Sequence, residues 1–377
     1  MTTQTISRNT GIFKSEMALW LGIITAVIFF TYGYVLMADL SNTLVFSLLF
    51  GWLFAVMLWL SFGVVRHADC LAVILGEPYG TLILTLAVIS IEVVMIAAVM
   101  MVGENIPTLA RDTMLSVLMI VINGMLGITL LVGGLKHHEQ EYNLAGARTY
   151  LGVIVPLATL GLILPRFTTS APGGQVSPLM AMFLLIMSAG LYTVFLLIQT
   201  RRHSQFFKQP VFDEEEHLDE DHHEGLVIRS TAYHVLFLVL TMLPIVLLSK
   251  SMAKLVDHGI EVLSAPHALG GFLVAILVLS PEGMGAVKSA LNNQLQRTVN
   301  IGLGSALSTI GLTIPAVLII SMVTGRTIEL GLEMPEIVLL SLTLVVATIN
   351  FGSGRTNIMQ GAVHLILFFS YVVLIFD

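Results

Sequence analysis

The chain has 377 residues, of which 56% are hydrophobic and 11% are charged, and its mean hydropathy is +0.92. Soluble domains carry about 25% charged residues, so this composition excludes a soluble globular protein and indicates a polytopic membrane protein. The single cysteine, Cys70, excludes an internal disulfide, and no basic stripe suited to nucleic acid is present. The net charge of −7 has a local origin, because eight of the 24 acidic residues lie in residues 213–224.

Apolar runs predict the membrane-spanning helices. A span needs about 20 mainly apolar residues, and it must be helical because lipid offers the backbone no hydrogen-bond partner. We therefore expect an all-α fold with about eleven transmembrane helices. The expected spans are residues 17–37, 44–64, 78–102, 112–134, 150–165, 177–198, 231–249, 268–290, 298–323, 335–350 and 356–376. The first is too long for a signal-peptide core and lacks a small-residue cleavage site, so we expect it to remain a helix.

The helices after the first form two sets of five. In each set the second helix carries one glutamate, and the third is rich in Gly, Ser, Thr and Asn. An odd number of spans inverts the second set relative to the first, as in the inverted repeats of secondary transporters. We therefore predict an N-terminal segment with one helix (1–43), a first repeat (44–198), an acidic cytoplasmic linker (199–230) and a second repeat (231–377).

The Lys and Arg residues predict the orientation. If the N-terminus is inside, the inner segments hold twelve of the 17 Lys and Arg residues and the outer segments hold five. Positive residues favour the cytoplasmic side. The prediction is a cytoplasmic N-terminus, a cytoplasmic linker and a periplasmic C-terminus.

Two glutamates lie deep within apolar spans: Glu92 within residues 80–101 and Glu282 within residues 270–290. A carboxylate at the bilayer centre costs about 2.5–3.5 kcal/mol even on lenient scales, and such residues usually bind an ion, a proton or a partner charge. Burial favours the protonated form of a carboxyl group, whereas a cation beside it favours the ionised form. Proton and cation then compete for one group, which is the chemistry of an antiporter.

Other polar residues continue from the glutamates at helical spacing or lie on the polar third helices. Their hydroxyl and amide oxygens are hard ligands that suit Na⁺, K⁺ or Ca²⁺. The alternative is that they bond their own backbone or a neighbouring helix, as is expected of His364. The candidate supporting residues are Thr85, Asn123, Ser289, Asn293, Asn300, Ser305, Ser308 and Thr309. Glu77 is either a secondary site or a residue that favours the positive end of its helix.

The linker contains a dense acidic segment. Like-charge blocks are usually solvated and disordered, and the functional alternative is a regulatory segment that senses or concentrates cations at the cytoplasmic mouth. Its acidic residues are Asp213, Glu214, Glu215, Glu216, Asp219, Glu220, Asp221 and Glu224.

Several long segments carry a family resemblance. They are residues 65–92 (VRHADCLAVILGEPYGTLILTLAVISIE), 133–143 (GGLKHHEQEYN), 195–200 (FLLIQT), 279–293 (LSPEGMGAVKSALNN), 296–315 (QRTVNIGLGSALSTIGLTIP) and 354–361 (GRTNIMQG). In these segments the chain resembles the calcium/proton (cation) exchangers of the cation/calcium exchanger superfamily, in particular bacterial antiporters of the ChaA type. The resemblance implies one extra helix plus two inverted five-helix repeats, with an acidic cytoplasmic stretch between them. It also implies ion-binding carboxylates at Glu92 and Glu282 and a Gly-Ser element at Gly304-Ser305.

The chain departs from the general pattern of these exchangers before each glutamate. A Gly-Asn pair precedes the glutamate in that pattern, and its amide helps to build the metal site. Here the corresponding residues are Val88-Ile89 and Val278-Leu279. Fewer oxygen ligands remain, so monovalent or broad cation exchange is favoured over tight calcium binding.

These patterns predict a multi-pass antiporter of a bacterial inner membrane. It would export Na⁺, K⁺ and/or Ca²⁺ in exchange for H⁺, with membrane lipid around it, no cofactor and no nucleic acid partner. One alternative is a cation channel or uniporter without proton coupling. A more distant alternative is an intramembrane enzyme that uses the two carboxylates, but the chain has no P-loop, Gly-x-Ser-x-Gly or His-Glu-x-x-His motif.

Overall fold

The computed structural model describes residues 11–75, 86–87, 89–97, 106–210, 227–266 and 268–377. Nine helices within these residues are long and apolar enough to span a membrane, and a tenth apolar helix, Met334–Asn350, is shorter. Residues 89–97 form part of a further helix, which carries Glu92. The predicted all-α, multi-pass architecture is confirmed.

The first half begins with the short helix α1 (Ile12–Ser15) and the extra N-terminal helix α2 (Met17–Leu36). The first repeat follows, and the helix that carries Glu92 is its second span. The other elements of this repeat are α3 (Thr43–Leu75), α5 (Leu109–Leu118), η1 (Met119–Met125), α6 (Leu126–His137), α7 (Leu144–Ala158), η2 (Thr159–Ile163), η3 (Leu164–Phe167) and α8 (Pro178–Leu197). The chain then continues through η4 (Ile198–Arg202) and η5 (Ser204–Phe207).

The second repeat has the same order of spans. They are α9 (Thr231–Leu263), α10 (Ala268–Leu291), α11 (Leu295–Ser308), η6 (Thr309–Thr313), α12 (Ile314–Thr324), α13 (Met334–Asn350) and α14 (Ile358–Phe376). Two short strands, β1 (Gln140–Glu141) and β2 (Arg355–Thr356), pair antiparallel with Gln140 opposite Thr356. They join the loops that follow α6 and α13.

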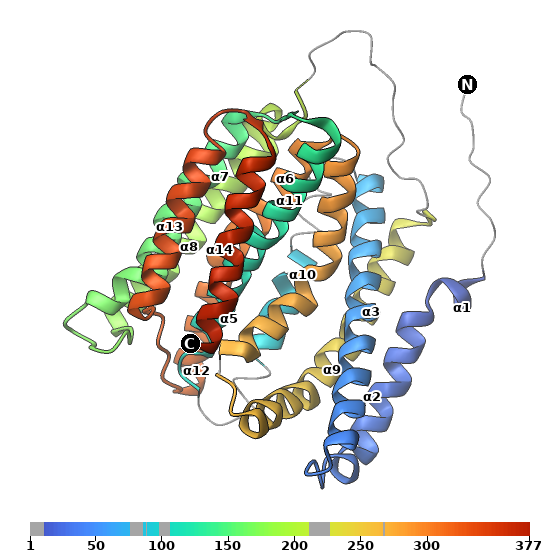
Figure 1. The fold of residues 1–377 in the computed structure, drawn as a ribbon. Coiled ribbons are helices and arrows are strands. Elements are labelled where there is room, and N and C mark those ends of the chain that lie inside the picture. Colours follow the sequence, from blue (N-terminus) through green and yellow to red (C-terminus); the bar gives the residue numbers. More distant parts are fainter. Residues whose placement is uncertain (1–10, 76–85, 88, 98–105, 211–226, 267) are drawn as a thin grey trace.

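The two repeats match span by span and are inverted. The first helix of each repeat is long, since α9 has 33 residues and α3 is helical over all of its described residues from Thr43 to Leu75. The third span of each repeat is interrupted by a π-helical segment, η1 in the first and η6 in the second. The α7–α8 loop and the α13–α14 turn hold equivalent places in the two repeats, and they lie at opposite ends of the bundle (Figure 1).

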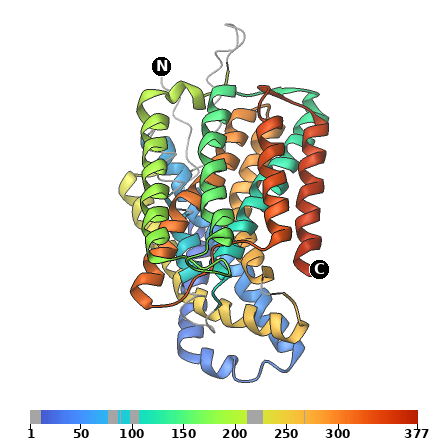
Figure 2. The same ribbon diagram turned by 90° about the vertical axis from the view of Figure 1, so that its left-hand side faces the viewer.

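The helices that carry the glutamates lie between two packed bodies. One hydrophobic cluster is built mainly from α2, α3 and α9, and the other from α5 to α8 and α11 to α14. The Glu92 helix contributes Met95 to the first cluster and Ile96 to the second, and α10 likewise contributes Val274 and Ala275. Figure 1 shows α2, α3 and α9 on one side of α10, and Figure 2 shows α7, α8, α13 and α14 side by side on the opposite face.

Several helix ends differ from the prediction. The spans expected at 44–64 and 231–249 are parts of the longer helices α3 and α9. Helix α3 continues because Arg66 and His67 find polar partners within the protein rather than in lipid. The span expected at 150–165 starts earlier, at α7, because the Asn143 side chain accepts hydrogen bonds from the first free amides of the helix.

Candidate cation site

Glu92 is buried at the interface between the two repeats, with only 1% of its surface exposed. Thr309 Oγ1 donates a hydrogen bond to Glu92 Oε2 at 2.8 Å, and Thr313 Oγ1 donates to Glu92 Oε1 at 3.2 Å. Each carboxylate oxygen therefore has a hydroxyl partner. Both partners belong to the second repeat, so the carboxylate of one repeat is held by the third span of the other.

The π-helical geometry of η6 explains how two threonines reach one carboxylate. A π turn is wider than an α turn, so residues four apart come close to one face, and such segments often occur at functional sites. Gly311 lies between the two threonines, and a Cβ atom there would lie 2.9 Å from Tyr192 Cδ2 of α8. The glycine thus lets α8 pack closely against η6 on the side away from Glu92.

Glu282 on α10 is also buried, with 9% of its surface exposed. Its side-chain partner is the Ser305 hydroxyl of α11. Glu282 Oε2, however, is buried without a hydrogen-bond partner among the described residues. An unpaired buried carboxylate oxygen is costly, and a proton or a cation would satisfy it.

A proline next to Glu282 leaves one carbonyl of α10 without its usual helical donor. Pro281 lies inside α10 and has no N–H, so the carbonyl of Leu277 loses its usual intrahelical donor. Leu277 is five residues before Glu282 and is fully buried. A carbonyl freed in this way is a hard oxygen donor of the kind that coordinates alkali and alkaline-earth cations.

The charges around the two glutamates are mainly negative. Glu92 and Glu282 lie close enough for their charges to repel each other, and Asp69 on α3 adds a further negative charge near Glu282. Arg297 is the positive group within electrostatic reach of Asp69. In the part of the chain that the structure describes, no three His, Cys, Asp or Glu residues cluster as a metal site. A cation here would be bound by two carboxylates together with hydroxyl and carbonyl oxygens.

The structure brings two of the predicted supporting residues to the glutamates, namely Thr309 and Ser305. Two others bond their own helix, since Ser308 donates to the Ser305 carbonyl and Ser289 donates to the Gly285 carbonyl. Their hydroxyls therefore stabilise local backbone in this structure.

Three predicted asparagines lie away from the hydrogen bonds of the glutamates. Asn123 of η1 donates to Thr343 Oγ1 at 2.8 Å and lies 3.0 Å from His364 Nδ1, which joins three helices. Asn293, just after α10, accepts from Gln140, and Asn300 donates to the carbonyl of Phe207. The expected interhelical role of His364 is confirmed. The π segments of the two repeats thus differ in their partners, since Thr309 of η6 donates to Glu92 whereas Asn123 of η1 bonds Thr343 and His364.

Some predicted residues lie outside the described part of the chain. They are Thr85, Glu77, Val88 and the acidic residues of 213–224. Their roles stay predictions.

Two features near the glutamates were missed from the sequence. Thr313 was detectable, because it follows Thr309 by four residues on the polar side of the same span. The Leu277 carbonyl had a signal in Pro281, which directly precedes the buried glutamate.

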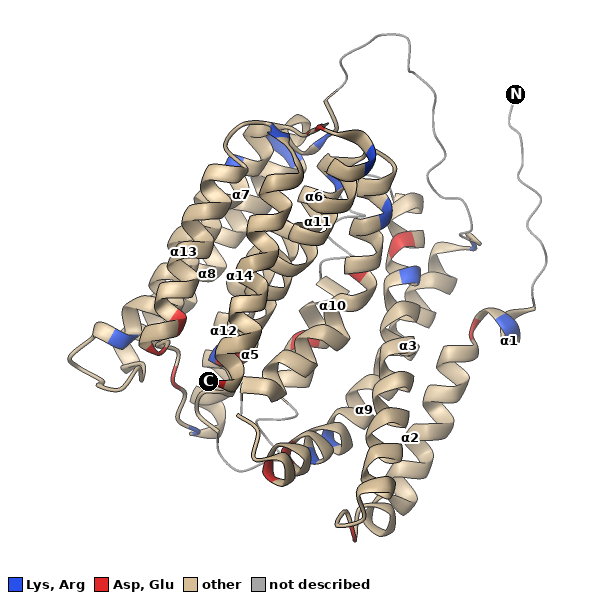
Figure 3. Cartoon of the chain, viewed as in Figure 1, with Lys and Arg blue, Asp and Glu red and all other residues tan. Residues whose placement is uncertain are grey.

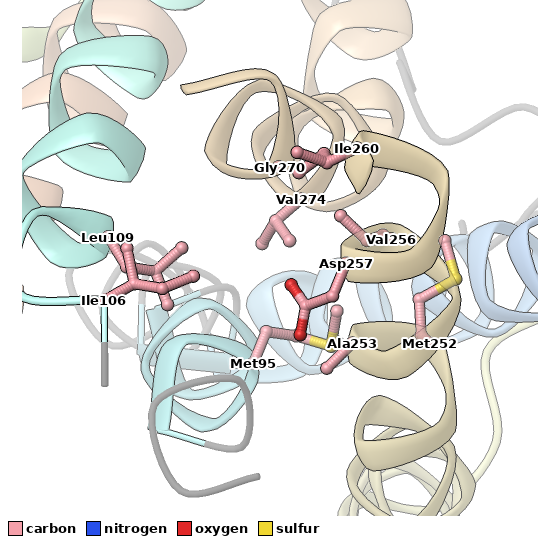
Figure 4. A pocket seen from close by; sticks show the side chains of 10 residues that line it. All are labelled: Met95, Ile106, Leu109, Met252, Ala253, Val256, Asp257, Ile260, Gly270 and Val274. Atoms are coloured by element: carbon pink, nitrogen blue, oxygen red, sulfur yellow. The ribbon is translucent and has the colours of Figure 1, made fainter. Parts of the chain in front are cut away.

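A pocket lies near the glutamate helices and was also missed. It is lined by Met95, one turn after Glu92, by Val274 of α10, and by residues of α9 and of the start of α5. The side chain of Asp257 points into this mainly apolar pocket (Figure 4). Charged groups are uncommon in apolar surroundings. The sequence contained a signal for this pocket, because Asp257 lies near the end of the long apolar helix α9.

Comparisons with known proteins agree with this geometry. The family model described as "Sodium/calcium exchanger protein" matches residues 45–201 and 233–376, which are the two repeats. The chain is 43% identical over 318 residues to the sodium-potassium/proton antiporter ChaA of Escherichia coli (strain K12), covering 84% of this chain and 85% of the relative. The fold is similar to native YfkE, with a TM-score of 0.72 at 18% identity over 96% of this chain and 99% of that one. It is also similar to the H⁺/Ca²⁺ exchanger CAX, with a TM-score of 0.67 at 13% identity over 96% of this chain and 88% of that one. The chain therefore belongs to the sodium/calcium exchanger family of membrane transporters.

Proposed function

We propose that this protein is a cation/proton antiporter in which Glu92 and Glu282 alternately hold a proton and a cation. The observation that carries the proposal is the arrangement of two buried carboxylates between the two repeats, with Glu282 Oε2 unpartnered among the described residues. A buried carboxylate that lacks a counter-charge requires a proton or a cation. The name of the Escherichia coli relative supports proton coupling.

The residues define a simple exchange cycle. In one state the carboxyl groups are protonated and neutral, and in the other a cation neutralises their charge. Thr309 and Thr313 donate to the oxygens of Glu92, so they stabilise its ionised form when a cation is bound. Because either state neutralises the charge, the glutamate helices could move between the two packed bodies without exposing a bare carboxylate to lipid.

The site favours broad or monovalent cation selectivity. The residues that replace the Gly-Asn pairs are apolar and, where described, buried: Ile89, Val278 and Leu279. They contribute no side-chain oxygen, so the site lacks the two amide ligands of the Gly-Asn pattern, and Ca²⁺, which takes six to eight oxygens, loses more from this than a monovalent cation does. We therefore propose Na⁺ and K⁺ as substrates, with Ca²⁺ as a weaker one. The sodium and potassium in the name of the Escherichia coli relative are consistent with this order.

The proposed location is a bacterial inner membrane, with the N-terminus in the cytoplasm and the C-terminus in the periplasm. Lys and Arg residues gather at one end of the bundle, near the ends of α6, α7 and α11 (Figure 3). Under this topology Val227, which follows the acidic segment, and the N-terminal end of α2 lie on the same side of the membrane. The positive-inside rule makes this end cytoplasmic.

The proposal is tested with inside-out vesicles that carry a preset proton gradient and a pH-sensitive dye. Addition of Na⁺, K⁺ or Ca²⁺ should dissipate the gradient in the wild type. Glu92→Gln and Glu282→Gln should each abolish this response, because an amide cannot exchange a proton for a cation. The control is Glu261→Gln, which removes an exposed carboxylate at the end of α9 and should leave the response unchanged.

The same vesicles separate antiport from the channel or uniporter alternative. A channel would pass radioactive Na⁺ or K⁺ without moving protons once the membrane potential is clamped. Normal dye responses in both glutamine variants would overturn the site assignment. Measuring the charge moved per cation for each ion would then fix the stoichiometry.

A further inference from the structure

A second cluster of buried titratable groups lies at the junction of α2, α3 and α9, away from the two glutamates. Its core is His67 of α3 and His234 of α9, which are 1% and 2% exposed. Their Nδ1 atoms lie 3.0 Å apart. Glu16 precedes α2 and is 3% exposed. Its Oε2 atom lies 3.1 Å from His67 Nε2. The cluster joins the N-terminal helix to the first helix of each repeat.

The hydrogen bonds assign the protons of both rings. The backbone N–H of Arg229 donates to His234 Nε2 at 2.9 Å, so the proton of a neutral His234 lies on Nδ1. The Nδ1–H of His234 faces His67 Nδ1, which must accept this hydrogen bond and therefore carries no hydrogen. The proton of a neutral His67 then lies on Nε2. Nε2 then donates to the Glu16 carboxylate. Because His67 Nε2 carries a hydrogen, it cannot accept from Arg66, although the two nitrogens are 3.2 Å apart. Arg66 donates to Glu16 instead.

An added proton cannot be accommodated by this chain of hydrogen bonds. With a third proton on the two rings, either the two Nδ1 atoms both carry hydrogens and face each other, or His234 Nε2–H faces the N–H of Arg229. In both cases one hydrogen bond becomes a contact between two donors. Both rings are excluded from water, so no solvent compensates for the loss.

Several other charged or titratable groups surround the two rings. They are Glu16 just before α2, Arg66 of α3, Arg229 just before α9 and Tyr233 of α9, while Asp69 and Cys70 lie further along α3. The Glu16 carboxylate already accepts from Arg66 at 2.5 Å and from Tyr233 at 2.5 Å. Burial raises the pKa of Glu16, but its hydrogen bonds from His67 and Tyr233 and the charge of Arg66 outweigh this effect and hold the pKa at about 2. The carboxylate therefore stays ionised and does not take the added proton.

We propose that the His67–His234 pair is a proton-binding site that switches transport off when it is protonated. Protonation breaks the link between α3 and α9, the first helices of the two repeats, which belong to the hydrophobic cluster against which the glutamate helices pack. The ligand is a proton from the side of the membrane on which α2 begins. This regulation rests on the proposed antiport, but the opening of the junction does not.

The first test measures exchange in inside-out vesicles as a function of the bath pH. His67→Asn keeps an acceptor near the position of Nδ1, His234→Gln keeps an acceptor near the position of Nε2, and neither residue titrates. In each variant the acid limb of the exchange profile should move to lower pH by about one unit or more, whereas the rate at about pH 8 stays near the wild-type rate. His258→Gln is the matched control, because His258 lies on the same helix and bonds only the carbonyl of Leu40 in the described structure. An unchanged acid limb in both variants would overturn the proposal.

The second test does not depend on transport or on the folding of a variant. Cys70 is buried on α3 one turn from His67, and it is the only cysteine in the chain. The thiolate is the reactive form of cysteine, so labelling by N-ethylmaleimide should slow as the pH falls if the junction stays closed. An opening junction predicts a shallower fall below about pH 6.5, because a proton taken up by the rings favours opening and offsets the loss of thiolate. A decline as steep as that of a free thiol would overturn the switch even if Glu92→Gln and Glu282→Gln abolish exchange, and a shallower decline would support it even if the protein exchanged no protons.

Discussion

Glu92 and Glu282 hold equivalent places in the two repeats but differ in their hydrogen bonds. Both oxygens of Glu92 accept from threonines of η6, whereas Glu282 has one partnered and one unpartnered oxygen among the described residues. Hydrogen bonds to a charged group contribute about 1.5–3 kcal/mol each. The threonines therefore favour the ionised, cation-loaded form of Glu92, and this asymmetry can be tested one hydroxyl at a time.

Thr309→Val and Thr313→Val should each weaken exchange without abolishing it. Each change removes one hydroxyl donor and keeps the shape of the side chain, so the half-saturating Na⁺ concentration should rise by about tenfold. The measurement is the rate of dye recovery in vesicles against Na⁺ concentration. Thr324→Val is the control, because the Thr324 hydroxyl donates only to its own helix within the described contacts and is exposed. Equal curves for Thr313→Val and Thr324→Val would remove Thr313 from the site.

At the scale of elements, a buried carboxylate links the start of the N-terminal helix to both repeats. Glu16 receives hydrogen bonds from α3 and α9, and its pKa of about 2 lies below the ordinary value of 4.5. The folded state therefore favours the ionised form. Its contribution to stability is fully present above about pH 4.5 and is lost as the pH falls towards 2.

Glu16→Gln should lower the melting temperature of the purified protein at about pH 7, because the charged hydrogen bonds of this junction contribute about 2 kcal/mol. The difference between wild type and variant should shrink as the pH falls from about 4.5 towards 2. Thermal unfolding in detergent across this range is the measurement. Asp39→Asn removes an exposed carboxylate just beyond the other end of α2 and should change the melting temperature little at any pH. A difference that grows on acidification would contradict the assignment.

Hydropathy predicted where the spanning helices lie, but it did not predict how they end or where they bulge. The extension of α3 beyond residue 64 and the start of α7 depend on Arg66, His67 and Asn143, whose partners are distant in the sequence or lie in the capping turn. The π segments η1 and η6 leave no trace in hydropathy, yet η6 brings Thr309 and Thr313 to Glu92. The glutamates were predictable because a buried charge stands out in an apolar run, whereas their partners depend on packing between the repeats.

For the whole molecule, the inverted repeat explains why the chain matches its family in two parts. Residues 45–201 and 233–376 are two copies of one plan, and each supplies one glutamate to a shared interface. The repeat was predictable from the odd number of spans between equivalent features. The hydrogen bonds from the third span of the second repeat to the carboxylate of Glu92 were not predictable. They join residues more than 200 positions apart in the sequence.

The orientation of this plan in the membrane can be tested with two serines in equivalent connections. Ser170 lies in the α7–α8 loop and Ser353 in the α13–α14 turn, and both are exposed. In a Cys70→Ser background, Ser170→Cys should react with a membrane-impermeant maleimide in intact cells. Ser353→Cys should react only in inside-out vesicles, because the Lys and Arg distribution places that turn in the cytoplasm. Labelling of both cysteines from one side would contradict the inverted repeat, and the reverse pattern would contradict the cytoplasmic N-terminus while leaving the inversion intact.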